Sequence, residues 1–270
     1  MLDRILEGQV ALVTGSGRGL GRAFAERLAS LGCNIVVHGM REAGPSEYGG
    51  QQTLTDVAQA ISDTHGVRTV KVLADLTRME DIERLVATAA GELGPIDILV
   101  HNAGGDIAAA GGKPNPNDVV HIKAEDVRAV IDRNLLSTIF VCQRVAQGMM
   151  ERRRGRIVTV GSVAGSKGRT NASIYATAKA AAAHFTRCLA DQMRPYGIAV
   201  NVLAPGDTRT ERFLATRAVD PERLAEDGTL DRVATVDEVA RVIEFLAGPM
   251  GAFVSGQVIR VDGGGQTWAA

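Results

Sequence analysis

The stretch Val10-Ala-Leu-Val-Thr-Gly-Ser-Gly-Arg-Gly-Leu-Gly21 decides the fold of this chain. It opens with a short apolar run typical of a buried strand, and Leu20, Phe24 and Leu28 then recur at helical spacing. In the glycine-rich turn between them, the backbone can approach a pyrophosphate, which the free N–H groups of the helix N-terminus can bind. The glycines read Thr-Gly-x-x-x-Gly-x-Gly, and no Gly-Lys-Ser/Thr of a Walker loop follows. The stretch therefore predicts a dinucleotide site, with a turn that binds no ligand as the alternative.

Apolar strand runs alternate with helical patterns along the whole chain. The runs cover residues 10–13, 35–37, 70–73, 96–100, 156–160, 198–203 and 258–261. This order predicts an α/β fold of the Rossmann type: a doubly wound, mainly seven-stranded parallel sheet with helices on both faces. Because no internal repeat or long linker divides the sequence, residues 1–270 are expected to form a single domain.

A second motif carries acid–base chemistry. Tyr175 and Lys179 are four residues apart, so on a helix they share one face. There the ammonium is expected to lower the pKa of the phenol from its usual value of about 10, which would let the phenol exchange a proton near neutral pH. Ser162 lies upstream at a strand end and could hold a substrate oxygen beside the phenol. Taken alone, this spacing also suits a chance surface pair.

Together these motifs resemble the classical short-chain dehydrogenase/reductase family, and the resemblance covers nearly the whole chain. Within that family, the overall sequence pattern resembles that of the 3-oxoacyl-carrier-protein reductases. The resemblance implies a catalytic set of Asn134, Ser162, Tyr175 and Lys179. In this set Ser162 and Tyr175 hold the reacting oxygen, and Tyr175 gives or takes the proton. Lys179 would also grip the nicotinamide ribose, and Asn134 would hold a water that relays protons from Lys179.

The resemblance also implies where an NAD(P) cofactor lies. The glycine-rich turn would bind the pyrophosphate, the pair Asp75-Leu76 the adenine ring, and the loop after Pro205-Gly206 the nicotinamide side. The full set of expected contacts is Gly15, Ser16, Arg18, Gly19, Leu20, Gly39, Met40, Arg41, Asp75, Leu76, Asn102, Ala103, Gly104, Tyr175, Lys179, Pro205, Gly206, Thr208 and Thr210.

Two positions depart from the family pattern. His101 stands where the first residue of Asn-Asn-Ala-Gly is usual, so altered local hydrogen bonding with retained activity is expected. Asp207 and Thr208 stand where apolar residues are common, which leaves the nicotinamide-side contacts open.

The choice between NAD and NADP depends on the end of the second strand. An acid there binds the ribose 2′-hydroxyl and repels a 2′-phosphate, but this chain has Gly39 at that position. Arg18 and Arg41 could both reach a 2′-phosphate, so NADP(H) is favoured. Glu42 or Glu47 could instead fold back and supply the missing carboxylate, which keeps NAD(H) as the alternative.

Three stretches break the regular pattern, at residues 40–50, 105–118 and 207–232. Loops at the C-terminal ends of parallel strands border the ligand crevice, and plain surface loops are the alternative. The third stretch matches the family's substrate lid by position. Its Arg209, Arg212 and Arg217 could steer an anionic substrate or could simply be solvated.

Composition narrows the class of protein. With 270 residues, 45% hydrophobic, the chain can bury one large core, and a net charge of −1 gives no global attraction to nucleic acid or membrane. No transmembrane or signal segment is recognisable. Cys33, Cys142 and Cys188 have no paired spacing, and the histidines form no metal-ligand cluster. A cytoplasmic enzyme without metal, membrane or nucleic-acid partner is expected.

The resulting hypothesis is an oxidoreductase that transfers a hydride between NAD(P)(H) and a carbonyl or secondary alcohol. A 3-oxoacyl thioester ketone is the first substrate candidate, and a sugar, polyol or cyclic alcohol oxidised with NAD is the alternative. A non-catalytic dinucleotide-binding protein is a remote third, since such a protein has no reason to keep all four catalytic residues. A homotetramer is expected, because small side chains on the Tyr175 helix would allow a helix of another subunit to approach closely. These residues are Ala178, Ala180, Ala181, Ala182 and Ala183.

Overall fold

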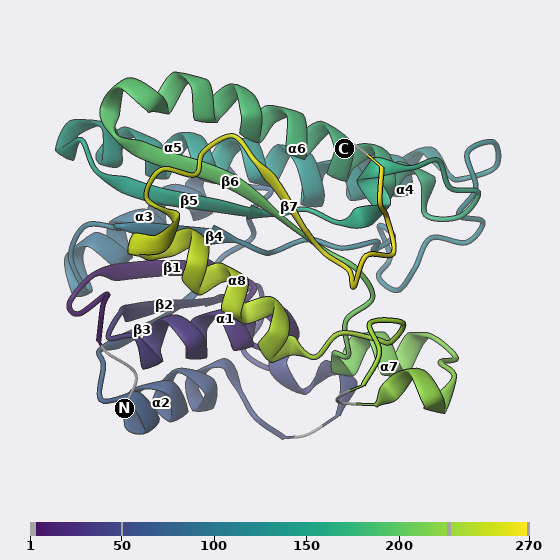
Figure 1. The fold of residues 1–270 in the computed structure, drawn as a ribbon, viewed down its shortest axis with the longest axis horizontal. Coiled ribbons are helices and arrows are strands. Elements are labelled where there is room, and N and C mark those ends of the chain that lie inside the picture. The colour runs from purple at the N-terminus through teal and green to yellow at the C-terminus, as the bar shows by residue number, and fades with distance from the viewer. Residues whose placement is uncertain (1–3, 50, 226–227, 269–270) are drawn as a thin grey trace.

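The computed structural model describes residues 4–49, 51–225 and 228–268 (Figure 1). Its strands are β1 (Val10–Thr14), β2 (Asn34–Gly39), β3 (Thr69–Leu73), β4 (Ile98–His101), β5 (Gly155–Val160), β6 (Ile198–Pro205) and β7 (Val258–Val261). They form one seven-stranded parallel sheet. The predicted fold class is confirmed, and each predicted strand lies within two residues of the observed one at either end.

Eight α-helices connect or follow these strands within the described residues. They are α1 (Gly19–Ser30), α2 (Leu54–His65), α3 (Met79–Glu92), α4 (Ala124–Ile131), α5 (Ser137–Arg152), α6 (Ser173–Met193), α7 (Glu211–Thr216) and α8 (Val236–Ala247). The strand order is β3-β2-β1-β4-β5-β6-β7, so the chain reverses direction across the sheet between β1 and β4. A crevice for ligands opens at the carboxyl ends of the strands at such a reversal.

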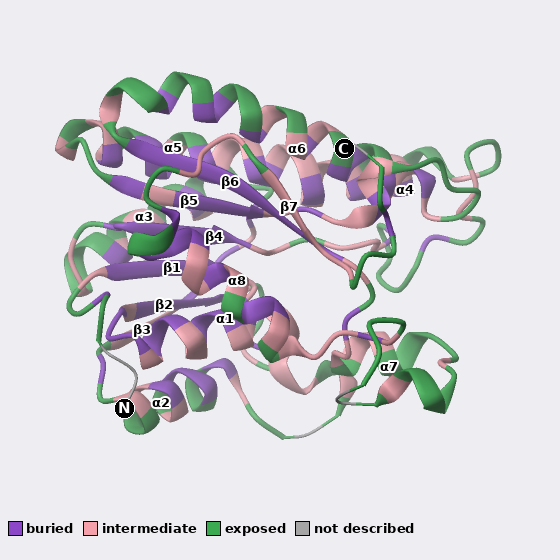
Figure 2. Cartoon of the chain, viewed as in Figure 1, coloured by how far each residue is buried: buried purple, intermediate pink, exposed green. Residues whose placement is uncertain are grey.

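The core has two layers, one on each face of the sheet. Successive strand residues point to opposite faces, so Ala11 and Val13 pack with α1, α2 and α8, while Val10 and Leu12 pack with α3, α5 and α6. All four side chains are buried. Figure 2 shows the same arrangement: the central strands are buried along their length, and the helices are exposed on their outer sides.

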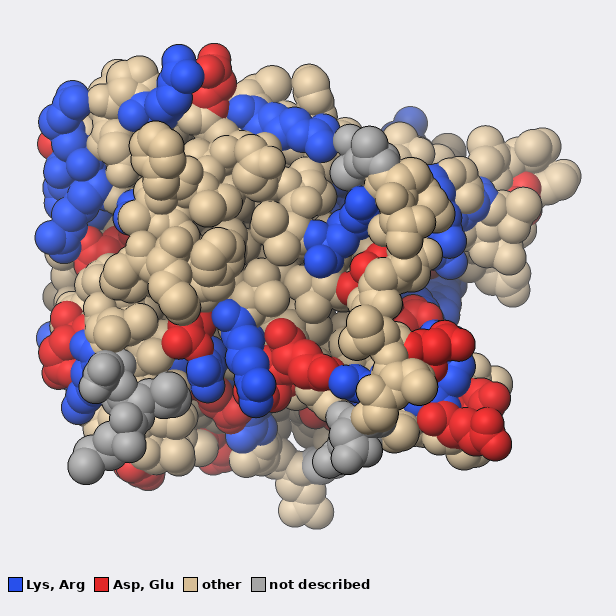
Figure 3. Space-filling view, viewed as in Figure 1, with Lys and Arg blue, Asp and Glu red and all other residues tan. Residues whose placement is uncertain are grey.

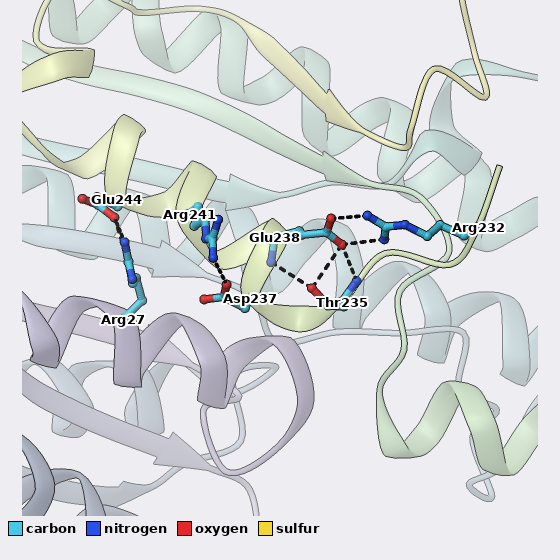
Figure 4. A network of polar contacts seen from close by, with 7 residues as sticks. All are labelled: Arg27, Arg232, Thr235, Asp237, Glu238, Arg241 and Glu244. Carbon is cyan, nitrogen blue, oxygen red and sulfur yellow. Dashed lines mark hydrogen bonds and ion pairs between the residues drawn. The ribbon is translucent and has the colours of Figure 1, made fainter. Parts of the chain in front are cut away.

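Helix α8 is fixed at its start and along its length by a polar network (Figure 4). Thr235 and Glu238 form a reciprocal capping box at its N-terminus, and Arg232 pairs with the Glu238 carboxylate at 2.6 Å. Farther along the helix, Glu244 binds Arg27 of α1. Because residue 232 ends the predicted lid, these contacts anchor the lid's C-terminal end to the body of the fold.

The described residues of the three irregular stretches lie at or near the carboxyl edge of the sheet (Figure 1). Residues 40–50 contain a short 3₁₀ helix at Gly44–Tyr48, and residues 207–232 contain α7 and a 3₁₀ helix at Pro221–Leu224. Residues 105–118 contain no helix or strand. In the part of the chain that the structure describes, no helix has the length and apolar character needed to span a membrane.

Candidate active site

Three of the four predicted catalytic side chains gather where β5 and α6 meet. Ser162 follows β5, and its Oγ accepts a hydrogen bond from the Ala164 backbone N–H at 3.1 Å. The same hydroxyl interacts with the phenol of Tyr175, in the first turn of α6. One turn later, the buried Lys179 donates from Nζ to the Val160 carbonyl at 2.8 Å. The spacing of the motif therefore brings the trio together.

The electrostatics of this trio differ from the prediction. Burial raises the pKa of Tyr175, although the Ser162 hydrogen bond and the charges of Arg212 and Arg217 act in the opposite direction. Burial also lowers the pKa of Lys179 to about 8. The predicted lowering of the Tyr175 pKa by Lys179 is therefore wrong for this structure. The ammonium is directed to a backbone carbonyl, 5.8 Å from the centre of the phenol ring, and desolvation of the phenolate outweighs the favourable contacts.

Asn134 is fully buried in a single π-helical turn, Asp132–Leu136, between α4 and α5. Its Nδ2 donates to the carbonyls of Gly105 and Val130, and its Oδ1 accepts from the Gly105 N–H at 2.9 Å. The carboxamide thus holds the first residue of the 105–118 loop from both sides. The structure assigns this side chain a positioning task, and the predicted water relay stays a prediction.

The glycine-rich turn fits a pyrophosphate because side chains are excluded from it. A Cβ placed on Gly21 would lie 2.1 Å from the Gly15 carbonyl oxygen, and Gly15 itself has φ +67°. The turn opens into a cavity of about 510 Å³, a size suited to a bound dinucleotide. Most of the predicted contacts line this cavity: Gly15, Arg18, Gly19, Leu20, Gly39, Met40, Arg41, Asp75, Leu76, Asn102, Ala103, Gly104 and Thr210. These residues fit the NAD(P) that the fold implies.

The remaining predicted contacts do not line this cavity: Ser16, Tyr175, Lys179, Pro205, Gly206 and Thr208. Ser16 is fully buried, and its hydroxyl accepts from the backbone N–H of His38, so it joins the turn to β2 instead of facing the cavity. The Thr208 hydroxyl donates to the Gly206 carbonyl. Lys179 and Ser162 border a separate cavity of about 120 Å³. The large cavity thus suits the adenosine and pyrophosphate half of a dinucleotide, and Ser162, Tyr175 and Lys179 lie outside its lining.

The buried His38 joins the glycine-rich turn to the segment that follows β3. The Gly15 N–H donates to Nδ1 of His38 at 3.0 Å, and His38 Nε2 lies 3.1 Å from the Ala74 carbonyl. Burial lowers the pKa of His38 to about 4, so the ring is neutral and donates through Nε2. Sequence reasoning missed this residue, since a histidine at a strand end carries no signal of what its ring contacts.

His101, which departs from the family pattern, contacts Thr14 and Ser137 through its two ring nitrogens. Thr14 Oγ1 accepts from the N–H groups of Asn102 and Ala103, so its own proton is directed to His101 Nδ1 at 3.3 Å. The other ring nitrogen lies 3.5 Å from Ser137 Oγ. Burial, with the nearby Lys179, lowers the His101 pKa to about 3. The ring is therefore a neutral link between β1, β4 and α5.

The corner of the cavity lined by Arg18 and Arg41 also contains a carboxylate. Glu47, in the 3₁₀ helix Gly44–Tyr48, lies 2.8 Å from Arg18 Nη2 and 3.3 Å from Arg41 Nη2. Glu47, Arg18 and Arg41 all line the cavity. Both guanidiniums that were expected to reach a 2′-phosphate therefore contact the same acid, which the sequence had offered as the alternative.

The three lid arginines, Arg209, Arg212 and Arg217, form ion pairs or hydrogen bonds within the protein. Arg217 pairs with Asp207 at 2.7 Å, and Arg209 donates to the Leu224 carbonyl at 2.8 Å. Arg212 reaches from α7 to the Asp106 carbonyl at 3.0 Å, and it lines the large cavity. Its charge also acts on Tyr175. Arg212 thus lies between the cofactor half of the site and the phenol.

Other reactive side chains are dispersed. Cys33 and Cys142 are buried and Cys188 is exposed, and none of the three forms a disulfide. Within residues 4–49, 51–225 and 228–268, no group of three or more His, Cys, Asp or Glu side chains is placed to hold a metal ion.

Comparison with known proteins identifies the class to which this site belongs. A family model described as short chain dehydrogenase matches residues 9–219. The chain belongs to the short-chain dehydrogenase/reductase family. It is 38% identical to a cyclohexanol dehydrogenase of Rhodococcus sp. (strain TK6), a match that covers 98% of both chains. It is 35% identical to a 3-oxoacyl-[acyl-carrier-protein] reductase of Escherichia coli (strain K12), covering 96% of this chain and 97% of the relative.

Solved structures of this family share the fold over nearly the full length. A 7α-hydroxysteroid dehydrogenase complexed with NADH and 7-oxo glycochenodeoxycholic acid superposes with a TM-score of 0.81 at 29% identity, covering 97% of this chain and 96% of that one. A putative gluconate dehydrogenase from Agrobacterium tumefaciens gives a TM-score of 0.82 at 30% identity, covering 98% of both chains. This short-chain dehydrogenase/reductase is thus an oxidoreductase that acts on CH–OH groups with NAD(P)(H).

Proposed function

We propose that this enzyme interconverts a secondary alcohol and its ketone, with Tyr175 as the general acid and base. The observation that carries the proposal is the interaction of the Ser162 hydroxyl with the Tyr175 phenol, with the buried Lys179 one helical turn away. A bound NAD(P) supplies or accepts the hydride. Ser162 and Tyr175 hold the reacting oxygen between their hydroxyl groups. Tyr175 protonates that oxygen in reduction and removes its proton in oxidation.

The other two residues support this proton transfer. Lys179, whose pKa is lowered to about 8, can pass a proton toward the phenol near neutral pH. By the family resemblance it would also contact the nicotinamide ribose of a bound cofactor. Asn134 keeps the Gly105 backbone in place beside the site, and a water held by Asn134 completes the proton path to Lys179.

Two substrate classes follow from different observations. A 3-oxoacyl thioester ketone is the first, supported by the overall sequence pattern and by the similarity to the Escherichia coli reductase. A cyclic secondary alcohol, or a sugar or polyol, oxidised with NAD is the second. It is supported by the contact of Glu47 with both arginines and by the similarity to the Rhodococcus cyclohexanol dehydrogenase.

The test is a substrate panel followed by nicotinamide absorbance, with both cofactors and in both directions. We expect turnover with at least one ketone or secondary alcohol and none above background in Tyr175→Phe. Tight binding of the cofactor without turnover of any carbonyl or alcohol would instead support a non-catalytic dinucleotide-binding protein.

We also propose that the enzyme is a homotetramer. The small-sided helix α6 exposes Ala180, and Met250 and Phe253 are exposed shortly before β7. Figure 3 shows a broad surface with few charged side chains over β7 and the segment before it. Static light scattering at micromolar concentration is expected to give four times the 28.4 kDa chain mass, and a monomer would refute this assembly.

A cytoplasmic location completes the proposal. Three unpaired cysteines, one of them exposed at Cys188, suit a reducing compartment. Fractionation of cells that express the natural gene would test it, and enrichment in a membrane or extracellular fraction would contradict it.

A further inference from the structure

The end of β2 carries no acidic side chain and leaves little room for one. A Cβ placed on Gly39 would lie 3.1 Å and 3.3 Å from the two methyl carbons of Leu54. Leu54 is fully buried at the start of α2, so making room for a Cβ would disturb its packing in the core. A carboxylate for the adenosine ribose must therefore come from elsewhere in the chain.

The segment after β2 folds back onto the glycine-rich turn. Arg18 of the turn donates to the Gly44 carbonyl at 3.0 Å, and its guanidinium lies 4.5 Å from the centre of the Tyr48 ring. Pro45 packs closely over Gly17, where a Cβ would lie 3.1 Å from the Pro45 ring. These contacts fix the 3₁₀ helix Gly44–Tyr48 against the site, with Glu47 on the cavity wall.

Glu47 bridges the two cations of this corner. Its carboxylate lies 2.8 Å from Arg18 and 3.3 Å from Arg41, and 40% of its side chain is exposed, so it remains accessible to a ligand. A guanidinium is well suited to bind a phosphate. With Glu47 in place, however, both guanidiniums are already paired with an anion.

We propose that Glu47 replaces the missing strand-end acid and makes the enzyme select NAD(H) over NADP(H), an inference that rests on the proposed hydride-transfer function. The Glu47 carboxylate can accept hydrogen bonds from the ribose hydroxyls of NAD. The 2′-phosphate of NADP, with a charge of about −1.5 to −2, would have to lie beside Glu47 or break both of its ion pairs. The preference for NADP drawn from the two arginines alone is replaced by this assignment.

The other acid of the same loop is committed to a different contact. Glu42 accepts from the N–H and hydroxyl of Thr55, and it pairs with Lys71 at 2.8 Å. These contacts lower the Glu42 pKa to about 2. Glu42 is not among the residues that line the large cavity. It therefore provides a matched control, the same residue type five positions earlier in the chain.

The experiment measures the dissociation constants of NADH and NADPH by nicotinamide fluorescence, without any substrate. The wild type is expected to bind NADH at least about tenfold more tightly, and Glu47→Gln to reduce that ratio by about tenfold, mainly through tighter NADPH binding. Glu42→Gln is expected to leave the ratio unchanged. The double variant Glu47→Gln/Arg41→Ala is expected to lose much of the NADPH gain, because a freed guanidinium provides it.

Three results would overturn the inference: tighter binding of NADPH by the wild type, an unchanged ratio in Glu47→Gln, or an equal change in Glu42→Gln. Failure of the proposed function gives a different pattern. In that case the wild type turns over no carbonyl or alcohol in the substrate panel, whatever its dinucleotide preference, whereas an error about Glu47 alone leaves turnover intact and changes only the preference.

Discussion

The two ends of the site are built in different ways. At the catalytic end, Tyr175 and Lys179 project from one face of the long helix α6, and Ser162 meets them from the end of a central strand. At the ribose end, Glu47 is carried by a short 3₁₀ helix and held by two arginines. The first end depends on the regular spacing of helix and strand, and the second on how one loop folds. Chemistry and cofactor choice should therefore respond to different substitutions.

The largest expected effect is at the catalytic end. Tyr175→Phe keeps the ring but removes the proton that the mechanism transfers. We expect turnover to fall at least about 100-fold, while the dissociation constants for NADH and NADPH change little. Steady-state kinetics and cofactor fluorescence on the same preparation measure both quantities. Turnover near the wild-type value would break the assignment of the acid.

The pH dependence tests the same end in both directions of the reaction. Because burial raises the Tyr175 pKa, the phenol stays protonated through neutral pH, as reduction requires. Reduction should be level below pH 8 and decline above it, as Lys179, with a pKa of about 8, loses the proton that resupplies the phenol.

Oxidation needs the phenolate, so its rate should rise with pH by up to about tenfold per unit. The measurement is kcat/KM from pH 6 to 10 with saturating cofactor in each direction. Identical profiles for oxidation and reduction would show that the phenol is not the group exchanging the proton.

A smaller effect concerns stability in acid. His38 and His101 are neutral when folded, with pKa values lowered to about 4 and about 3, whereas an unfolded histidine titrates near 6.5. Their contribution to stability is therefore present above pH 6.5 and is lost as pH falls toward those lower values. Each histidine should reduce the free energy of unfolding by about 1.4 kcal/mol per pH unit in that window.

His101→Asn should remove one of these contributions. Between pH 7 and pH 5 the variant should lose about 2 kcal/mol less unfolding free energy than the wild type in urea titrations. His184→Asn, at an exposed position, is the matched control and should behave like the wild type. An acid response of His101→Asn equal to that of the wild type would show that the buried ring does not resist protonation.

The smallest and broadest effect is expected from the loop at residues 105–118. Shortening it to a tight turn should change the substrate profile more than cofactor affinity, because Asp106 acts on the Tyr175 phenol. Part of the loop, from Ala109 to Gly112, also lines the large cavity, so a modest loss of cofactor affinity should accompany it. A change in cofactor affinity alone would place the loop wholly at the ribose end.

Much of the fold and the catalytic end could be predicted from the sequence. The apolar runs mark the strands, and the spacing of Tyr175 and Lys179 fixes their common helix face. The direction of the Tyr175 pKa could not be predicted, because it depends on burial and on where the Lys179 ammonium is directed. The choice of Glu47 over Glu42 was also open, since only the folded loop shows which carboxylate reaches the arginines.

One set of measurements on Tyr175→Phe and Glu47→Gln, made side by side, tests directly whether chemistry and cofactor choice depend on separate ends of the site. For each protein, turnover with the better cofactor and the ratio of the NADH and NADPH dissociation constants are determined. We predict that Tyr175→Phe lowers turnover at least about 100-fold and leaves the ratio unchanged, whereas Glu47→Gln changes the ratio by about tenfold and leaves turnover within about threefold. A single variant that moved both quantities to these extents would contradict the account.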